Sequence, residues 1–573
     1  MKRRRKGGCG GPAGGRIRWD SNEAIAERKS RLPLGPASLE ELNDWPRTNA
    51  IAICSRPEQL LRLRANMLRG VVVYSDYSGF CSEKEALIAG WSAMQKAVGL
   101  PLRGCPFRFD RTCDIEPLPL KLLCHISESQ LCGKMCVHKD IIDRLHRYAR
   151  RHCESQAPDP ATSSRKEAAQ AYEKMLEWLI ANKNWVLQDE QECLVHKTHC
   201  PTHPRMKMQQ EEDLGGDKIC DKIFMYFAGV SCDGWSSIGR QERFAHCSEL
   251  AHNVYIAERS ARADMEDLSI LECTQNYPVD DKLRKPLESS HTVVSVISGP
   301  ELFGHPVHRR RVFAACISKA RYIWVGPSDS DALDADFEAL FYRAAQLGGS
   351  AYFADSEDSR LRMYQAMAAS QTNRLSMDQL RRLPDDELLE LILPVGQLNI
   401  AKQWHADREM WEADCGELCV DLEHNVTERP RGGHLWPTQL SHGTIAHMPR
   451  DGRIRIATPL EHLGAQGFRV FCKDPSPMCR VINGRTTIPG GGCVSKSAAK
   501  ALIGRGVHIT VLSAWMNYIR ANMIPIRKAN IAMLRGLTLH LEGEGGGSGP
   551  SGSSSSQAAA GAGDTGEEDS RQS

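Results

Sequence analysis

Three kinds of reactive side chain follow one another in the middle of this chain. Cys232 and Glu272 each stand at the end of an apolar run, and an arginine cluster, Arg309 to Arg311, comes after them. A thiolate can act as a nucleophile, a carboxylic acid as a proton donor, and guanidinium groups as cationic hydrogen-bond donors. Addition of sulfur to a pyrimidine ring requires all three, so these residues are the first candidates for catalysis.

Small and acidic residues follow three earlier apolar runs. Tyr77, Ser78 and Gly79 form the turn after Val71-Val-Val-Tyr74, Asp114 follows a second run, and Asp140 a third. At the carboxyl ends of parallel strands such residues meet in one crevice, where the acids can bind ribose hydroxyls or an adenine amine. Each acid taken alone is better explained as a helix N-cap or a loop residue. Three acids at successive strand ends favour a binding site.

The elements that must position these residues alternate between strand and helix. Apolar runs typical of buried strands end near Cys113, Val137, Ala228, Leu271 and Ile297, and helical periods such as 83–91 fall between several of them. This alternation predicts an α/β fold with a parallel sheet covered by helices. A strong amphipathic helix at 164–181 interrupts the rhythm, and another helix is expected over 377–393.

Composition shifts divide the chain into seven segments. We expect a disordered basic leader (1–45), the first half of the α/β domain (46–149), a helical Cys- and His-bearing insertion (150–215), the catalytic half (216–320), a separate recognition-like module (321–450), segments that return to the α/β domain (451–540) and a disordered tail (541–573).

Length and charge narrow the class of protein. The 573 residues are 41% hydrophobic and 25% charged, which suits a globular chain with a sizeable core. A net charge of +2 leaves any affinity for nucleic acid to local patches. The 21 cysteines form no repeating framework, which favours a reducing compartment, and no apolar stretch is long enough to span a membrane. The basic start, Met1 to Lys6, is typical of a nuclear address or of a solvated tail.

Six short motifs, in order, resemble those of the cytosine-5 DNA methyltransferases, and most closely the divergent protist-like branch. Ser75 to Ser82 resembles D-L-F-x-G-x-G-G, Ser231-Cys232 the Pro-Cys loop, Glu272 to Thr274 E-N-V, and Val307 to Arg311 Q-x-R-x-R. The segments from Arg455 to Phe468 and from Gly504 to Val507 resemble the two closing motifs. The resemblance covers about residues 70 to 525 and implies a Rossmann-like S-adenosylmethionine-dependent methyltransferase fold with a smaller recognition domain.

The resemblance also implies a role for each site residue. Cys232 is the thiolate that adds to C6 of a cytosine rotated out of DNA, Glu272 protonates N3, and Arg309 and Arg311 fix the ring, with Arg311 on O2. S-adenosylmethionine is the implied methyl donor, held by Tyr77, Ser78, Gly79, Asp114, Ile115 and Asp140. In the 321–450 module Arg429 to Arg431, His434 and Trp436 are candidates for DNA contact, or else plain surface-loop residues.

Five positions depart from the family pattern: Cys81, Ser231, Cys273, Val307 and Arg505. Because the groups that make and break bonds remain, a competent DNA methyltransferase located in the nucleus is the leading hypothesis. RNA as substrate, or a noncatalytic nucleic-acid-binding protein that kept the fold, are the alternatives.

A further group of possible metal ligands lies in the insertion. Cys193, His196, Cys200 and His203 have the residue types that a tetrahedral zinc site uses. They are crowded into eleven residues, whereas zinc fingers separate two pairs by a long loop, so a Cys- and His-bearing loop without metal is the alternative.

Overall fold

The computed structural model describes residues 30–97, 99, 107–128, 134–159, 161–203, 222–236, 241–406, 417–423, 432–449, 453–483 and 494–526. The chain divides into two units, Met1–Pro525 and Ile526–Ser573, and only the first holds the elements described below. The expected tail and most of the expected leader, including the basic start, lie outside the described residues.

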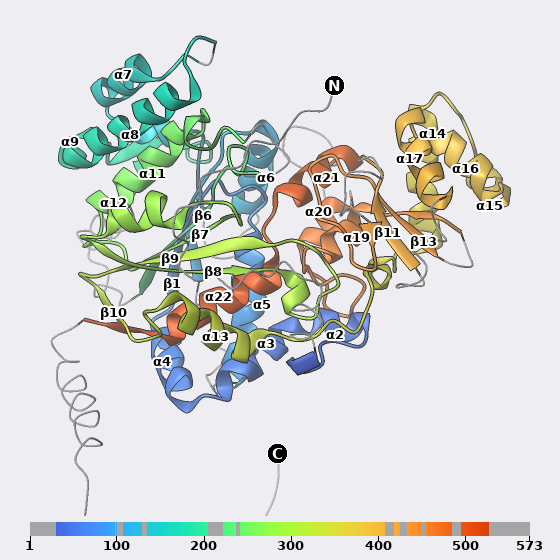
Figure 1. Ribbon diagram of the computed structural model, residues 1–573, viewed down its shortest axis with the longest axis horizontal. Coiled ribbons are helices and arrows are strands. Elements are labelled where there is room, and N and C mark those ends of the chain that lie inside the picture. The colour runs from blue at the N-terminus through green and yellow to red at the C-terminus, as the bar shows by residue number, and fades with distance from the viewer. Residues whose placement is uncertain are drawn as a thin grey trace, which may run out of the picture. The chain divides into compact units, whose positions relative to one another are not determined.

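A seven-stranded sheet forms the centre of the first unit (Figure 1). Its strand order is β3-β2-β1-β6-β7-β9-β8, and every pairing is parallel except those of β9, which runs antiparallel to both β7 and β8. The strands are β1 (Val71–Asp76), β2 (Phe107–Cys113), β3 (Cys136–His138), β6 (Ile223–Gly229), β7 (Leu268–Thr274), β8 (His291–Ser298) and β9 (Arg311–Ser318). The predicted strands and the α/β class are thereby confirmed.

The sheet is buried on both faces because helices cover each of them, and this explains why its central strands read as continuous apolar runs. One face packs against α3 (Trp45–Cys54), α4 (Pro57–Leu68), α5 (Ser82–Ala97), α6 (Pro117–Glu128), α13 (Ser330–Phe341) and α22 (Ile509–Ala521). The other face packs against η1 (Ile141–Arg144), α8 (Arg165–Ala181), α11 (Glu249–Ala261), η3 (Asp280–Arg284) and α12 (Lys285–Leu287).

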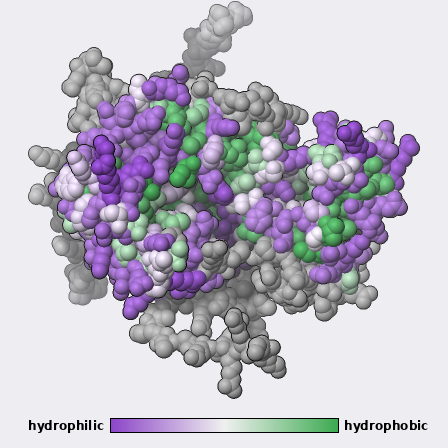
Figure 2. Space-filling model, turned by 90° about the horizontal axis from the view of Figure 1, so that it is seen from above, coloured by the Kyte–Doolittle hydropathy of each residue, from purple (hydrophilic) through white to green (hydrophobic). Residues whose placement is uncertain are grey.

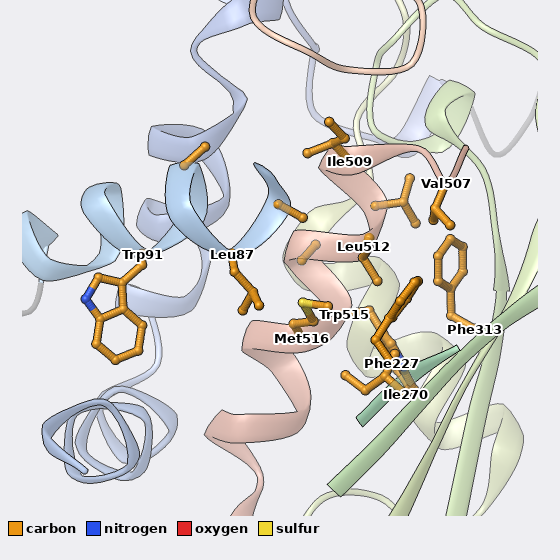
Figure 3. Close-up of a cluster of buried hydrophobic side chains, with 14 of the residues drawn as sticks. Leu87, Trp91, Phe227, Ile270, Phe313, Val507, Ile509, Leu512, Trp515 and Met516 are labelled. Atoms are coloured by element: carbon orange, nitrogen blue, oxygen red, sulfur yellow. The ribbon is translucent and has the colours of Figure 1, made fainter. Parts of the chain in front are cut away.

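Helix α22 is wedged between α5 and the sheet. In Figure 3 its Leu512 and Met516 lie between Leu87 of α5 and the sheet residues Phe227 and Ile270. Every residue of α22 is buried, including the polar side chains of Thr510, Asn517 and Arg520. The last described segment of the chain is therefore a core element of the domain that holds the earlier motifs.

The amino-terminal boundary differs from the prediction. The leader was expected to reach residue 45, but α2 (Leu39–Asn43) begins inside it, and Leu42 and Trp45 are buried. Ser38 caps this helix by accepting a hydrogen bond from the Glu41 amide. The stretch is too short to show a helical period in the sequence, and its packing partners lie hundreds of residues away, as the hydrogen bond from Trp45 Nε1 to the Gly467 carbonyl shows.

Within the residues that the structure describes, the predicted insertion holds three helices and a hairpin. These are α7 (Arg147–Gln156), α8, α9 (Lys183–Val186), and the paired strands β4 (Glu190–Glu192) and β5 (His199–Pro201). The predicted helix at 164–181 is confirmed, and Ser164 and Glu167 form a capping box at its start. Asn253 of α11 donates to the Tyr172 carbonyl, which fixes α8 against the catalytic half.

The 321–450 region holds a helical group and a small antiparallel sheet. The helices are α14 (Glu357–Ser370), α15 (Met377–Arg382), α16 (Asp385–Ile392) and α17 (Val395–Ala406). The sheet consists of β11 (Glu417–Asp421), β12 (Gly432–Gly433) and β13 (Ile445–Pro449), and β14 (Arg455–Ile456) joins it from the segment that follows the region. The single helix expected over 377–393 is wrong, because Pro384 separates α15 from α16. Apolar side chains lie among hydrophilic ones on this helical group, at the right of Figure 2.

The remaining elements connect these parts. They are β10 (Tyr322–Trp324), which pairs with β15 (Met523–Pro525), and the helices α19 (Pro459–Gly464), α20 (Met478–Ile482), α21 (Lys496–Arg505), η2 (Arg243–Ala245), η4 (Pro300–Leu302) and η5 (Gly349–Tyr352). Within the described part of the chain, none of the helices has the length and apolar character needed to cross a bilayer.

A network of buried ion pairs joins the carboxyl end of β1 to β2, η1 and α11. Arg144 of η1 pairs with Asp76 on β1 and with Glu258 on α11, at 2.6 Å from the latter, and all three side chains are at most 1% exposed. Arg111 of β2 lies 3.4 Å from Asp76. Burial alone would raise the pKa of Asp76, but Arg144 and Arg111 overcome that effect and hold it below its usual range.

We expect Arg144→Met to lower the free energy of unfolding by about 3–5 kcal/mol, because it removes the nearer of the two cations, Arg144 and Arg111, that the buried Asp76 and Glu258 share. Urea-induced unfolding measures the change. Arg150→Met is the matched control, since Arg150 forms surface pairs with Asp143 and Glu154 and should cost less than about 1 kcal/mol. Equal stability of the two variants would show that the network contributes little.

Candidate active site

The three candidate catalytic side chains come from neighbouring strands at one edge of the sheet. In the register Gly229 of β6 lies beside Glu272 of β7, and Thr274 of β7 lies beside Arg311, the first residue of β9. Because β9 runs antiparallel to β7, its amino end meets the carboxyl ends of β6 and β7. Cys232 follows β6 by three residues. The reversed strand thus brings the arginine to the edge where the thiol and the carboxyl group lie.

Glu272 and Arg311 form a mostly buried ion pair. Arg311 Nε lies 3.2 Å from Glu272 Oε1, and the side chains are 16% and 8% exposed respectively. Burial raises the pKa of Glu272, while the positive charges of Arg311 and Arg309 oppose that rise without cancelling it. A carboxyl group in such surroundings can hold and release a proton closer to neutral pH than an exposed glutamate does.

The Cys232 thiol is electrostatically coupled to the same groups. Burial raises the pKa of Cys232; Arg311 and Arg309 lower it, and Asp233 and Glu272 raise it further. A thiol is a better nucleophile once ionised, and Arg311 provides the largest influence in that direction. The predicted triad of Cys232, Glu272 and Arg311 therefore forms one electrostatic unit.

The nucleophile loop is held by side chains other than the proline of the family pattern. Ser231 Oγ donates to Asp233 Oδ2 at 3.2 Å, and the Ser236 amide donates to the Cys232 carbonyl at 2.7 Å. Trp235 packs edge-on against Phe244, with ring centroids 4.8 Å apart, and against Tyr277 in the segment after β7. Ser231 thus supplies through a local turn part of the stiffness that proline supplies through its ring.

Arg309 lies where the sequence places it, but its guanidinium group binds the protein itself. It is 3% exposed and donates to the carbonyls of Gln439, Gly504 and Gly506 at 3.2, 3.3 and 2.6 Å. Burial lowers the pKa of Arg309 to about 9, which keeps it cationic at neutral pH. These bonds hold the backbone at Gly504 and Gly506 against Gln439 of the 321–450 region. In this structure the guanidinium group therefore binds the protein and does not point to the ring contact that the resemblance implied.

The turn after β1 has the conformation that a close backbone approach requires. Tyr77, Gly79 and Cys81 all have positive φ, of 54°, 53° and 64°. Ser78 closes the turn by donating to the carbonyls of Ser75 and Cys113. The Tyr77 hydroxyl is buried with no hydrogen-bond partner in the described structure. A buried hydroxyl in this state is a feature that a bound ligand would satisfy.

Backbone amides hold the acidic residues at the ends of β2 and β3. Asp114 accepts from the amides of Gly79 and Glu116, both within 2.9 Å, and burial raises its pKa. Asp140 caps η1 through Oδ1, as the more cautious interpretation held. Ile115 is 66% exposed, so its apolar side chain is accessible to a ligand.

The other departures from the family pattern have local explanations. Cys81 and Cys273 are buried as small apolar residues, and Val307 packs into the cluster around Trp436. Arg505 lies 3.4 Å from Glu116, so it links the closing segment to the loop that carries Asp114 and Ile115. The chain has thus packed each substitution into its fold.

The structure corrects two expectations about the recognition region. Trp436 is fully buried against Phe353 and Tyr352, so it is neither a DNA contact nor a surface-loop residue. Its carbonyl accepts a hydrogen bond from the His308 amide, which ties the 321–450 region to the loop that carries Arg309 and Arg310. His434 is partly buried. Arg429 to Arg431 lie outside the described residues.

A cavity of about 690 Å³ adjoins the catalytic edge. It opens between the loop after Cys232 and the segment after Glu272, and Asn276 bridges them by donating to the Trp235 carbonyl at 3.3 Å. Aromatic and polar side chains line it, among them Trp235, Phe244, Tyr277 and Gln275. Neither Cys232 nor Glu272 belongs to its lining, so the cavity is a neighbour of the candidate site and not the site itself.

Three of the four predicted metal ligands come together. The side chains of Cys193, His196 and Cys200 meet with that of Cys136, and their ligand atoms all lie within 4.8 Å of one another. His203, the fourth predicted ligand, is fully buried beside Arg262 and Glu258 instead. Cys136 lies on β3, far from the other three in sequence. The only signal for it was a cysteine on the last strand before the insertion.

The influence of Arg311 on Cys232 can be measured without any substrate. We expect Arg311→Gln to move the midpoint of the pH profile for Cys232 alkylation by iodoacetamide to higher pH, because the cation that favours the thiolate is gone. Peptide-resolved mass spectrometry follows the rate. Arg310→Gln, which removes a guanidinium group that donates to Glu301, should leave the midpoint in place. An unchanged midpoint in Arg311→Gln would show that the two groups are not coupled.

No protein-family model and no curated protein matches the sequence. Among solved structures, the chain is similar to the Dnmt2 methyltransferase of S. pombe (TM-score 0.34, 13% identity, covering 78% of this chain and 98% of that one). It is also similar to a methyltransferase of Entamoeba histolytica (0.34, 10%, 78% and 98%) and to a DNA modification methyltransferase encoded within an E. coli prophage (0.33, 11%, 79% and 98%). TM-scores this low carry no argument alone. The strand order and the helices on both faces show a Rossmann-like α/β sheet, mostly parallel, with β9 reversed next to the edge.

Proposed function

We propose that this protein is a DNA cytosine-5 methyltransferase that uses S-adenosylmethionine. The observation that carries the proposal is the Glu272–Arg311 pair, at the edge of the sheet where β6 delivers Cys232. A thiol, a carboxyl group with raised pKa and a cation coupled to both are what activation of a cytosine ring requires.

The carbon to be methylated, C5 of cytosine, is a poor nucleophile until C6 is attacked. In the proposed mechanism the Cys232 thiolate forms a bond to C6, the electrons of the C5–C6 double bond move into the ring, and N3 takes a proton from Glu272. The resulting enamine has a nucleophilic C5 that accepts the methyl group. Water then takes the C5 proton, the C6–S bond breaks with its electrons remaining on sulfur, and N3 returns its proton to Glu272, which restores the ring, the free thiolate and the acid.

The surroundings of Glu272 suit a proton donor. Because burial raises its pKa, a larger share of Glu272 carries a proton near neutral pH than of an exposed glutamate. Arg311 would exchange its present contact with Glu272 for the O2 atom of the ring. Once the arginine turns to the substrate, the carboxyl group loses the cation that favoured its ionised form, and protonation becomes easier.

The cofactor-binding residues fit S-adenosylmethionine by their chemistry. The unpartnered Tyr77 hydroxyl, the carboxyl groups of Asp114 and Asp140 and the exposed Ile115 would hold it at the carboxyl ends of β1, β2 and β3. The bound cofactor supplies an electrophilic methyl group. The chain's own contribution is orientation: the amides of Gly79 and Glu116 fix the Asp114 carboxylate in place.

The substrate and the location complete the proposal. A cytosine inside a duplex hides C6, so the target base must be rotated out at a cost of a few kcal/mol, which is regained from contacts in the pocket. The 321–450 region would grip the DNA, and the basic start would direct the protein to the nucleus. The grip on DNA follows from the family resemblance of the motifs, and the nuclear location from the basic residues between Met1 and Lys6.

A covalent trap tests the proposal. Incubation with duplex DNA that contains 5-fluorocytosine and with S-adenosylmethionine should yield a protein–DNA adduct at Cys232, because fluorine at C5 cannot leave as a proton does. Cys232→Ser should give none. An adduct only with RNA of the same sequence would move the substrate to RNA, and DNA binding without any adduct would identify a noncatalytic binder.

The role of Glu272 predicts a pH dependence. The acid must be protonated, so wild-type turnover should fall as pH rises through the raised pKa of Glu272. We expect Glu272→Gln to be slower by about 10²- to 10⁴-fold and to lose this alkaline descent, because its amide does not titrate. Initial rates of methyl transfer between pH 5 and 9 measure both effects. Glu301→Gln is the control, since Glu301 pairs with Arg310 instead. A descent that persists in Glu272→Gln would assign it to another group.

A further inference from the structure

Three thiols and one imidazole converge at the junction between the sheet and the insertion. Cys136 comes from β3, Cys193 and His196 from the turn between β4 and β5, and Cys200 from β5 itself. Cys136 and Cys193 are buried, Cys200 lies at the boundary between buried and partly buried, and His196 is partly buried. None of these residues takes part in the proposed methyl transfer.

The distances in this cluster match those of a metal centre. His196 Nδ1 lies 3.5 Å from Cys136 Sγ, 3.4 Å from Cys193 Sγ and 3.4 Å from Cys200 Sγ. A tetrahedral zinc ion with Zn–S bonds of about 2.3 Å and a Zn–N bond of about 2.05 Å places nitrogen and sulfur about 3.5 Å apart. One ring nitrogen equally distant from three sulfurs is what coordination to a common ion produces, whereas a single hydrogen bond would favour one sulfur.

We propose that Cys136, Cys193, His196 and Cys200 bind one structural Zn²⁺ ion. Three thiolates and one imidazole form a soft ligand set that selects zinc over magnesium or calcium. Four protein ligands leave no open position, which is typical of structural rather than catalytic zinc. The site differs from the set expected from sequence spacing because Cys136 replaces His203.

The backbone around the cluster is already arranged for the ion. The Cys193 amide donates to the Thr198 carbonyl, the Lys197 amide donates to the Cys193 carbonyl, and Lys197 has a φ of 58°. This tight turn brings His196 back over Cys193, whose sulfur also accepts from the His196 amide at 3.5 Å. A non-glycine residue with positive φ costs free energy, and ligand binding at the turn would offset it.

The ion would join the insertion to the edge of the main sheet. The Leu194 amide donates to the Val137 carbonyl, and His138 Nδ1 lies 2.9 Å from the Glu192 carbonyl. Gln191 donates to the Asp140 carbonyl at 2.8 Å. Through these contacts the zinc site would steady the strand end that carries Asp140. The metal proposal itself does not depend on the proposed methyl transfer.

Metal content of the full-length protein tests the proposal. Protein purified without chelator should hold about one zinc per chain by native mass spectrometry. Cys136→Ser and His196→Gln should lose it. His199→Gln, an exposed histidine in the same hairpin, and Cys247→Ser, an exposed cysteine elsewhere, should keep it. Retention of zinc in Cys136→Ser would overturn the assignment of the fourth ligand.

A second measurement on the wild-type protein covers the case in which variants fail to fold. Cys136, Cys193 and Cys200 should resist iodoacetamide in the zinc-loaded protein and should all become reactive together once a chelator removes the ion, while Cys247 reacts in both states. Added Zn²⁺ should restore the protection. Metal-free wild-type protein, or protection that a chelator does not change, would contradict the proposal.

Discussion

The buried charge of Asp76, at the end of β1, constrains the turns that follow β1 and β3. Asp76 is fully buried, and a carboxylate removed from water is tolerated only when cations and hydrogen bonds replace the solvent. Arg144 and Arg111 provide them, and Glu258 and Arg259 extend the network into α11. Arg144 belongs to the turn that Asp140 caps, and Asp76 directly precedes Tyr77. One electrostatic requirement therefore fixes the turns after β1 and β3 relative to each other, because neither can move without exposing an unpaired buried charge.

On the opposite side of the site the buried charge of Arg309 likewise requires polar partners in place of water. The hydrogen bonds of its buried guanidinium group go to backbone carbonyls, and two of these belong to Gly504 and Gly506, where an added Cβ atom would force neighbouring atoms to shift. A Cβ atom on Gly504 would lie 2.5 Å from the Leu440 backbone, and one on Gly506 would lie 2.4 Å from the Phe80 ring. Close approach is therefore what brings these carbonyls within reach of the arginine. Phe80 lies in the turn after β1. The backbone from Gly504 to Gly506, the loop that carries Arg309 and the turn after β1 therefore form one packed unit.

The sequence predicted those features that depend on local pattern. β1, β6 and β7 are continuous apolar runs because both of their faces are covered, and the capped helix α8 carries its own start signal in Ser164. Features that depend on distant partners were missed. Nothing local to Cys136 reveals that a hairpin more than fifty residues later will dock beside it. The burial of Trp436 likewise depends on Phe353 and Tyr352. The short helix α2 depends on distant contacts such as the hydrogen bond from Asn43 to the Val470 carbonyl. The order of Cys232, Glu272 and Arg311 was readable, whereas the carbonyl partners of Arg309 were not.

The departures from the family pattern spare the electrostatics of the site. Val307, Cys273 and Cys81 bring no new charge, and the added charge of Arg505 pairs with Glu116 on the surface. Cys232 and Glu272 consequently respond to two cations, of which Arg309 donates to three backbone carbonyls and Arg311 is held by Glu272 and the Arg310 carbonyl. Arg311 is thus the cation that can turn to a substrate. Because it lowers the pKa of both the thiol and the acid, its turning toward a bound ring would favour the protonated acid and weaken its support for the thiolate, so binding and proton transfer are coupled through a single side chain.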